Sequence, residues 1–462
     1  MRTIEDNTTL PSELTLEIEK LSNLGFGIAR KDRCIIFVED SCPGDILKVK
    51  VTKRHKNYAN AVISEIIKPS SHRCEPICAM QKVCGACQLQ FIEYGFQLEQ
   101  KKEIVLDAFH GMGIEVKNVI PSPKITGYRM KIQYPVSETK NSKRILAGYY
   151  KTNSHEIVNI KHCPIQPQYC DEIVEFIRGE AQALKIGGYR EKEHTGDLKH
   201  IVIRASEYSG KYLVILVVNS SKIPDKIKKL ASKIYTELEN IAGVGVNFNS
   251  KKTNLILGKT TVINEGDSYI EEKLCDKVFK IGADTFFQIN PLSANNMFEY
   301  VKKYISDHYK SPVILDAYAG IAAFGISLSD IAKKVVCVEE ITSSVKLAAS
   351  IIKENNIDNI ELHNSDAAEF FETEFRNNGK SFDIIVVDPP RKGCTIESLD
   401  YALKLTKDKI IYVSCNPSTL ARDLKYLTEN GCVVEYVQPF DMFPHTYHIE
   451  CVAIINVKKE MT

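Results

Sequence analysis

The spacing of apolar residues along the chain changes twice, and each part predicts a different kind of domain. Between Leu14 and Pro69, apolar and polar residues alternate in short runs, which turn sequences such as Pro43-Gly44-Asp45 separate. Alternation with a period of two predicts half-buried strands. Several short strands with regular turns favour a small barrel. We therefore expect an all-β barrel of the oligonucleotide-binding type over residues 10–69.

The middle of the chain combines a cysteine-rich linker, one helix and a second β-rich region. Residues 91–123 include an amphipathic stretch, and we expect this helix to pack on the last domain. Residues 70–90 and 124–282 are expected to form a central β-rich domain that carries the cysteine cluster. Within it, we expect one helical stretch near residues 169–184.

The last part of the chain, residues 283–462, changes to apolar strands that alternate with amphipathic helices. This alternation predicts a doubly wound, Rossmann-like α/β sheet, in which ligands bind at the carboxyl ends of the strands. The expected fold class is therefore multidomain, with an N-terminal barrel, a central β-rich domain and a C-terminal α/β domain.

Composition limits the class of protein and the compartment in which we expect it. Hydrophobic residues make up 44% and charged residues 26% of the 462 residues, which excludes wholesale disorder, collagen and coiled coil. The start of the chain lacks the apolar core of a signal peptide, and no apolar run approaches the ~18 residues that a membrane helix needs. We expect a cytoplasmic protein that does not contact a membrane.

Charge and cysteine content raise two further questions. Lysine and arginine total 60 against 59 acidic residues, so any surface that binds a polyanion must be local. The basic turn Lys53-Arg54-His55-Lys56 is one such surface, and it also fits a solvated hairpin tip. The 14 cysteines are not expected to form disulfides in a reducing compartment, which leaves metal binding and catalysis as roles to consider.

Acidic residues follow successive predicted strands of the last domain, where a cofactor would bind. Asp316 ends the first strand and precedes a turn with a single glycine, Gly320. Glu339 ends the next strand about 20 residues later, where an acid can accept hydrogen bonds from a ribose, and Asp366 and Asp388 follow later strands. A single glycine favours S-adenosylmethionine over a dinucleotide. Each acid alone also fits a helix cap, so the series of acids is what favours the cofactor.

Two reactive groups lie late in the chain. Cys415 follows a predicted strand and precedes a helix that begins at Pro417, a setting that favours a thiolate of low pKa. Glu450 precedes a second apolar strand and could act as a general base. Taken alone, Cys415 also fits a small core residue and Glu450 a surface acid. Their interpretation depends on the motifs around them.

These motifs resemble those of the RNA uracil-C5 methyltransferases, and the likeness covers nearly the whole chain. Its N-terminal part, with Leu24-Gly25-Phe26-Gly27-Ile28-Ala29-Arg30, resembles their RNA-binding TRAM domain. The segments that resemble their catalytic and cofactor motifs are Phe286-Phe287-Gln288-Ile289-Asn290, Asp388-Pro389-Pro390-Arg391, Ser414-Cys415-Asn416-Pro417 and His448-Ile449-Glu450. The resemblance implies that Cys415 is the nucleophile and Glu450 the base. It also implies contacts to S-adenosylmethionine or the active site from Gln288, Tyr318, Glu339 and Asp388.

The turn after the first strand departs from the family pattern. Members usually have a cysteine and Gly-x-Gly after the aromatic residue of this turn, whereas this chain has Ala319 and Gly320-Ile321-Ala322. Gly320 is kept, so we expect the turn to survive. Ala323 stands where some members have an asparagine, and that contact is not carried over.

Uracil chemistry explains why a thiolate and a carboxylate belong together. C5 of uracil is a poor nucleophile, but addition of a thiolate to C6 turns the ring into an enolate with negative charge at C5. C5 then takes the methyl group of S-adenosylmethionine, a base removes the C5 proton, and elimination frees the cysteine. We expect the target base to be flipped out of an RNA loop into the site.

A cysteine cluster lies between the first two predicted domains. Cys74, Cys78, Cys84 and Cys87 fall close together, and a remote cysteine, Cys163, precedes a proline. Four cysteines suit either a structural zinc ion or an iron–sulfur cluster. The spacing resembles the [4Fe–4S] site of a ribosomal-RNA branch of the family, which implies Cys78, Cys84, Cys87 and Cys163 as ligands and Cys74 as a spare. The Cys-x3-Cys-x2-Cys spacing of radical S-adenosylmethionine enzymes is absent.

The resemblance implies a monomeric, S-adenosylmethionine-dependent enzyme that methylates C5 of a uridine in 23S rRNA, with tRNA as an alternative substrate. A second alternative is a cytosine-C5 RNA methyltransferase, in which a catalytic cysteine usually stands at the position of Arg391. A third is a non-enzymatic, redox-sensing RNA-binding protein that uses the iron–sulfur cluster. The presence of both Cys415 and Glu450 argues against the third.

Overall fold

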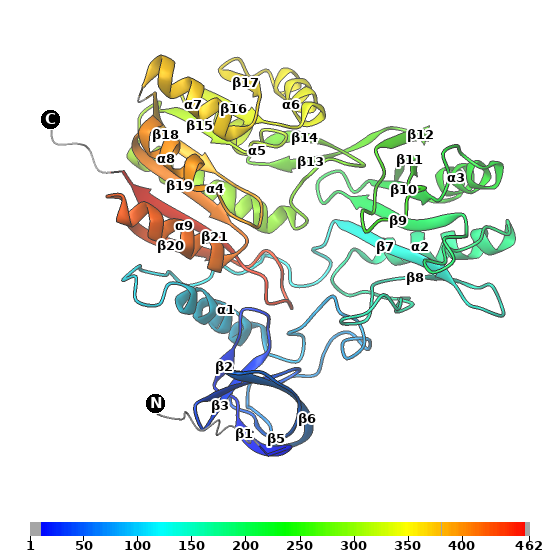
Figure 1. The fold of residues 1–462 in the computed structure, drawn as a ribbon. Helices are drawn as coiled ribbons and strands as arrows, with labels where there is room; N and C mark the ends of the chain where they lie inside the picture. Colours follow the sequence, from blue (N-terminus) through cyan, green and yellow to red (C-terminus); the bar gives the residue numbers. More distant parts are fainter. Residues whose placement is uncertain (1–10, 380, 458–462) are drawn as a thin grey trace, which may run out of the picture.

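The computed structural model describes residues 11–379 and 381–457. The expected domain ends at residue 10 and at residues 458–462 lie outside these ranges. Figure 1 shows a small barrel at the bottom, a sheet with two helices at the right and a larger α/β sheet at the upper left. No helix within the described ranges is long and apolar enough to cross a membrane.

The N-terminal barrel is one six-stranded sheet with the order β1-β5-β6-β4-β3-β2. Alternate side chains such as Leu14 and Val49 point inward and are buried, as a period of two requires. The basic turn is the tip of the hairpin between the two longest strands, where the rings of His55 and Tyr58 stack with centroids 4.2 Å apart. The strands are β1 (Glu13–Glu17), β2 (Lys20–Leu21), β3 (Gly27–Lys31), β4 (Cys34–Val38), β5 (Ile46–Arg54) and β6 (Tyr58–Lys68).

The central sheet has the order β12-β11-β10-β9-β7-β8. Two helices cover one face, and the other face packs on the C-terminal domain through residues such as Val202 and Ile215. We expected one helix in this region, and this prediction was wrong because the lysine-rich surface of the second helix conceals its buried stripe, which includes Ile227 and Leu230. The elements are β7 (Lys131–Glu138), β8 (Ile145–Ala147), α2 (Gln168–Ala183), β9 (Leu198–Ala205), β10 (Tyr212–Val218), α3 (Asp225–Glu237), β11 (Ile241–Phe248) and β12 (Thr260–Gly266).

The C-terminal domain confirms the predicted alternation of strands and helices. Its seven-stranded sheet has the order β17-β16-β15-β18-β19-β21-β20, in which β21 runs antiparallel to the other six strands. The strand order reverses between β15 and β18, the place where ligands bind in such sheets. Its elements, with the preceding hairpin, are β13 (Tyr269–Leu274), β14 (Lys277–Gly282), α4 (Pro291–His308), β15 (Val313–Ala317), α5 (Ala323–Leu328), β16 (Lys334–Glu339), α6 (Thr342–Glu354), β17 (Ile360–Asn364), α7 (Ala367–Asn378), β18 (Phe382–Val387), α8 (Ile396–Leu405), β19 (Thr406–Ser414), α9 (Pro417–Glu429), β20 (Val433–Phe440) and β21 (Glu450–Asn456).

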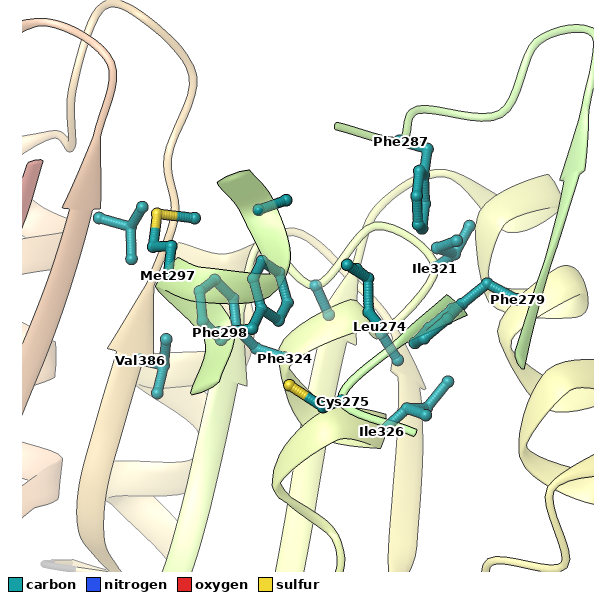
Figure 2. Close-up of a cluster of buried hydrophobic side chains, with 14 of the residues drawn as sticks. Leu274, Cys275, Phe279, Phe287, Met297, Phe298, Ile321, Phe324, Ile326 and Val386 are labelled. Atoms are coloured by element: carbon teal, nitrogen blue, oxygen red, sulfur yellow. The ribbon is translucent and has the colours of Figure 1, made fainter. Parts of the chain in front are cut away.

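The β13–β14 hairpin joins the central and C-terminal domains. Figure 2 shows Phe279 of this hairpin in one buried cluster with Phe298 and Phe324 of the C-terminal domain. The rings of Phe298 and Phe324 stack with centroids 4.0 Å apart. Phe287 belongs to the same cluster, so this core also fixes the segment that carries Gln288.

Helix α1 (Tyr94–Ala108) lies between the barrel and the C-terminal domain. Its Lys101 is fully buried and donates a hydrogen bond to Asp441 Oδ1 at 2.6 Å. One turn earlier, the Gln97 side chain accepts a hydrogen bond from the backbone N–H of His445 at 3.0 Å. These bonds fix the loop that leads into β21.

Candidate active site

The pairing of β19 with β21 brings Cys415 and Glu450 together. In the antiparallel register of these strands, Ser414 lies opposite Cys451. Cys415 follows Ser414 and Glu450 precedes Cys451, so both side chains start at the same end of the strand pair. Opposite residues in such a pair have Cα atoms about 4.5–5.5 Å apart. The structure thus places the two candidate catalytic residues next to each other.

Glu450 is buried and Cys415 is half-buried. Glu450 is 4% exposed, and burial raises the pKa of its carboxyl well above the usual value. Burial also raises the pKa of the Cys415 thiol to about 11, and the charge of Glu450 adds to the effect. The sequence favoured a thiolate of low pKa, and for the free protein this prediction was wrong. Desolvation and neighbouring carboxylates outweigh the cation and the helix N-terminus beside the sulfur.

Asp388 and Arg391, in the loop after β18, complete a group of charges around the thiol. Burial raises the pKa of Asp388 to about 7, and the charge of Asp388 in turn raises the pKa of Glu450. Arg391 lies beside the Cys415 sulfur and acts to lower the pKa of both Cys415 and Glu450. Sequence reasoning missed Arg391 as a site residue. Its place three residues after Asp388, beyond the carboxyl end of β18, was the available signal.

The turn after β15 and the carboxylate of Glu339 form a second edge of the site. Tyr318, Gly320 and Ala322 have φ angles of 65°, 57° and 59°, so the chain turns tightly. Glu339 accepts hydrogen bonds from the backbone N–H groups of Gly320 at 2.9 Å and Ile341 at 2.8 Å. Open space surrounds the position that a Cβ of Gly320 would take. A ligand can therefore approach the backbone closely at this glycine.

Asp366 lies near Tyr318 and also caps a helix. Its Oδ1 accepts hydrogen bonds from two backbone N–H groups in the first turn of α7, at 2.9 and 3.3 Å. Burial raises the pKa of Tyr318 and the charge of Asp366 adds to this effect, which places the two side chains within electrostatic range. Asp316 is buried instead and accepts a hydrogen bond from the Gly325 N–H at 2.8 Å. Asp316 thus holds the first turn of α5 in place and does not face the ligand edge.

Gln288 lies where the central and C-terminal domains meet. The carbonyl of Ile289 accepts a hydrogen bond from the Met130 N–H at 2.8 Å. Asn290 caps α4 and donates a hydrogen bond to the Met442 carbonyl at 3.1 Å. The segment that carries Gln288 is therefore bound both to the central sheet and to the loop that leads to Glu450.

Comparison with known proteins identifies the family. The tRNA (Uracil-5-)-methyltransferase family matches residues 93–458, and the TRAM domain matches residues 8–63. The chain belongs to the tRNA (uracil-5-)-methyltransferase family. It is an S-adenosylmethionine-dependent RNA methyltransferase, as the motifs implied.

Relatives of this methyltransferase extend over its full length. An uncharacterized RNA methyltransferase of Oceanobacillus iheyensis is 35% identical over 449 residues, 96% of each chain. Another, of Clostridium acetobutylicum, is 36% identical over 451 residues, 96% of this chain and 97% of the relative. The tRNA (uracil-54, C5)-methyltransferase of Pyrococcus abyssi, solved with S-adenosyl-L-homocysteine, matches with a TM-score of 0.77 and 27% identity, covering 96% of this chain and 100% of that chain. These matches confirm the TRAM domain and the methyltransferase fold.

The methyltransferase gathers four of its five clustered cysteines in one neighbourhood. Burial raises the pKa of the Cys163 thiol to about 12, and the charges of Cys87 and Cys78 add to this effect. The pKa of Cys84 is likewise raised by burial, with a contribution from Cys78. Within residues 11–379 and 381–457, however, no group of three or more His, Cys, Asp or Glu side chains is arranged to hold a metal ion. The four thiols therefore lie within electrostatic range of one another.

Cys74 lies apart from these four thiols. It is exposed, and its Sγ donates a hydrogen bond to the Gln90 carbonyl at 3.5 Å. Burial raises the pKa of its thiol, and the added effect comes from Glu93 and Glu75, with no contribution from the other clustered cysteines. The geometry therefore separates Cys74 from the group that includes Cys163.

Proposed function

We propose that this methyltransferase transfers a methyl group from S-adenosylmethionine to C5 of a uridine in RNA through a covalent bond between Cys415 and C6. The observation that carries the proposal is the meeting of Cys415, Glu450, Asp388 and Arg391 at the ends of β18, β19 and β21. A nucleophile, a carboxyl pair and a cation are the groups that addition to a pyrimidine and elimination from it require.

In the first step, the Cys415 thiol must lose its proton before it attacks C6. With a pKa of about 11 in the free protein, the thiol needs a nearby acceptor. The carboxylate of Asp388 takes this proton, which leaves Glu450 unprotonated for the second step. The new bond joins Cys415 Sγ to C6, and the C5=C6 electron pair moves into an enolate. The guanidinium of Arg391 is close enough to the sulfur to balance the negative charge that develops on the ring.

In the second step, C5 takes the methyl group that the sulfonium of S-adenosylmethionine supplies. Glu450 then removes the proton from C5, the C5=C6 double bond forms again, and the thiolate of Cys415 leaves. We assign the contacts to the cofactor and to the methyl-transfer position to Gln288, Tyr318, Glu339, Asp366 and Asp388.

Substitution of the two central residues tests this mechanism. Cys415→Ala should lower methyl transfer by roughly three orders of magnitude or more, while RNA binding persists. Glu450→Gln should allow addition and methylation but block removal of the C5 proton, so that a heat-stable protein–RNA adduct accumulates on a denaturing gel. Cys432→Ala is the matched control, because Cys432 is also buried but precedes β20 at the opposite end of the sheet. Near-normal turnover by Cys415→Ala would exclude the covalent role.

We also propose that Cys78, Cys84, Cys87 and Cys163 hold a [4Fe–4S] cluster. A zinc ion would require four sulfurs roughly 3.8 Å apart, because each Zn–S bond is about 2.3 Å long. A four-iron cluster spreads its cysteine ligands around an inorganic core. The four thiols lie within electrostatic range of one another, and their spacing in the sequence resembles that of a four-iron site. When bound, the cluster would cross-link the linker to the central domain.

Iron content tests the cluster. Protein purified without oxygen should be brown and contain about four iron atoms per chain. Cys163→Ser should lose this iron, whereas Cys74→Ser, the matched control outside the group, should keep it. Absence of iron from the unchanged protein, or equal loss in both variants, would contradict the assignment.

For the substrate, we propose 23S rRNA, on the strength of the cysteine pattern. The similarity to a tRNA (uracil-54, C5)-methyltransferase makes tRNA the second candidate. Mapping of 5-methyluridine in rRNA and tRNA from a deletion strain separates them, since only the true substrate loses the modified base. Loss of 5-methylcytidine alone would instead favour a cytosine-C5 enzyme. We expect a monomer in the cytoplasm, which sedimentation and cell fractionation would check.

A further inference from the structure

A cavity of about 600 Å³ opens between α8 and α9, outside the group of charges around Cys415. This volume lies within the roughly 300–1,000 Å³ range of ligand pockets. Its walls come from the loop that follows Arg391 and from one side of α9, and they include Lys392, Ile396, Leu399 and Tyr426. None of these four residues belongs to the proposed catalytic or cofactor set, so the cavity is available for another ligand.

A buried network holds the wall of the cavity in shape. Asp423 is 2% exposed, and its carboxylate accepts hydrogen bonds from the Cys394 N–H at 2.9 Å and the Tyr412 hydroxyl at 2.6 Å. Arg422 donates to the carbonyls of Lys392 at 2.9 Å and Cys394 at 3.1 Å. A Cβ at Gly393 would come within 2.6 Å of both the Arg422 and Asp423 side chains. The loop is therefore locked against α9, and the cavity is formed before any ligand binds.

The chemistry of the lining suits a nucleotide. Asp423 and Glu429 already have partners in Arg422 and Lys425, at 2.7 and 3.9 Å. The ammonium of Lys392 has no hydrogen bond or ion pair within the part of the chain that the structure describes, and is free to meet a phosphate. The 63% exposed Ile396, together with Leu399 and the ring of Tyr426, offers the apolar and aromatic surface on which a base can stack.

One loop and one helix connect the cavity to the active site. Lys392 follows Arg391, whose guanidinium acts on the Cys415 thiol. The Arg391 carbonyl accepts hydrogen bonds from Asn416 Nδ2 and Thr419 Oγ1, both at 3.3 Å. The same loop and the same helix thus border both the reactive sulfur and the cavity.

We propose that this cavity binds the nucleotide next to the target uridine in the RNA strand, with its phosphate on Lys392 and its base against Ile396, Leu399 and Tyr426. The proposal rests on the proposed function, because it takes the uridine at Cys415 as its starting point. Flipping one base out of a loop leaves its neighbour unstacked as well, and this cavity would receive that neighbour.

Binding of a short single-stranded RNA that contains the target uridine tests the proposal without any need for turnover. Lys392→Glu should weaken binding roughly tenfold and lower the slope of log affinity against log salt by about 0.7, the value for one phosphate on a single strand. Ile396→Asp should weaken binding to a similar extent. Lys303→Glu on α4 is the matched control, because this lysine is 77% exposed and far along the chain from the cavity. The RNA affinity of this variant should equal that of the unchanged protein. Equal affinities for Lys392→Glu and the control would overturn the proposal.

Photocrosslinking locates the neighbouring base directly. RNA with 4-thiouridine on either side of the target should crosslink to peptides that contain residues 392–399 or 422–426. Crosslinks confined to other parts of the protein would overturn the proposal. This outcome is also the one expected if the cavity binds a protein partner instead of RNA. This outcome is separable from failure of the proposed function, which the methyl transfer of Cys415→Ala reports.

Discussion

At the carboxyl end of β18 and the amino end of β21, Asp388 and Glu450 place two carboxyl groups where water has little access. Burial raises the pKa of Asp388 to about 7, and burial together with the charge of Asp388 raises the pKa of Glu450 well above its usual value. An acid with such a pKa changes its charge near neutral pH, whereas an ordinary carboxylate stays ionised there. The free energy of unfolding therefore depends on pH in a range where most acids have no effect.

Asp388→Asn is expected to flatten this dependence. The folded pKa of Asp388 lies above its ordinary value of 3.8, so its stabilising contribution is complete below about pH 4 and is lost as the pH rises through about 7. Between about pH 5 and pH 8, the unchanged protein should lose up to about 3 kcal/mol through this group. Urea unfolding at the two pH values measures the difference. Asp366→Asn, which replaces an exposed acid of the same domain, is the control and should leave the pH dependence of the unfolding free energy unaltered. An equal slope of unfolding free energy against pH for all three proteins would contradict the prediction.

At the scale of elements, the loop of residues 441–449 determines where Glu450 lies. Side chains from three other parts of the chain bind this loop. On α1, Lys101 bonds to Asp441 and Gln97 to His445. Asn290 at the α4 cap donates to the Met442 carbonyl, and the Tyr128 hydroxyl of the central domain donates to the Pro444 carbonyl at 2.9 Å. The position of the base is therefore set largely by contacts outside the α/β sheet.

Lys101→Met should test this dependence. Lys101 and Asp441 are both fully buried, so removal of the lysine leaves an unpaired carboxylate and should cost about 3–5 kcal/mol of unfolding free energy. The double variant Lys101→Met/Asp441→Leu should recover most of that loss. If the Lys101–Asp441 pair positions Glu450, the double variant should leave Glu450 misplaced. The C5 proton would then not be removed, and the heat-stable adduct should accumulate. Lys102→Met, whose partner is the exposed Asn118, should change stability by less than about 0.5 kcal/mol and form no adduct.

The element pattern also shows how far the sequence could lead. The change from a period of two to strand–helix alternation correctly predicted the barrel and the α/β sheet, because burial of one face imposes that spacing. The spacing of apolar residues did not place Cys415 beside Glu450, and only the family resemblance implied that they share a site. Their proximity depends on β21 entering the sheet antiparallel beside β19, a long-range pairing that leaves no local mark in the sequence. For the same reason, the burial that raises the pKa of the thiol could not be predicted.

At the scale of the whole molecule, the barrel contacts the catalytic machinery directly. Lys20 forms an ion pair with Asp107 of α1 at 2.6 Å. On the same side, a Cβ at Gly25 would lie 3.2 Å from the side chain of Tyr447, within the loop that precedes Glu450. The TRAM domain therefore stands against the loop that carries the base, in addition to any RNA that it binds.

Gly25→Val should disturb this contact. Gly25 has a φ of 77°, and Gly111 has a φ of 78° with open space around it, so Gly111→Val imposes the same backbone strain without a neighbour. Both variants should lose about 1–3 kcal/mol of local stability. Only Gly25→Val should lower the hydrogen-exchange protection of residues 441–449 and the rate of methylation. If both substitutions changed the hydrogen-exchange protection and the methylation rate equally, the contact of Gly25 with Tyr447 would not contribute to activity.

The antiparallel strand β21 has a consequence for synthesis of the chain. β20 is made before β21 but joins the seven-stranded sheet only through it. Until β21 leaves the ribosome, β19 and β20 both present unpaired backbone edges, which are sites for association with other chains. The strand that closes these edges also begins with Glu450. When β21 pairs with β19 and β20, the nascent chain gains its proton acceptor and loses its exposed strand edges at the same time. A translation product that lacks β21 should therefore be inactive and prone to associate with other chains.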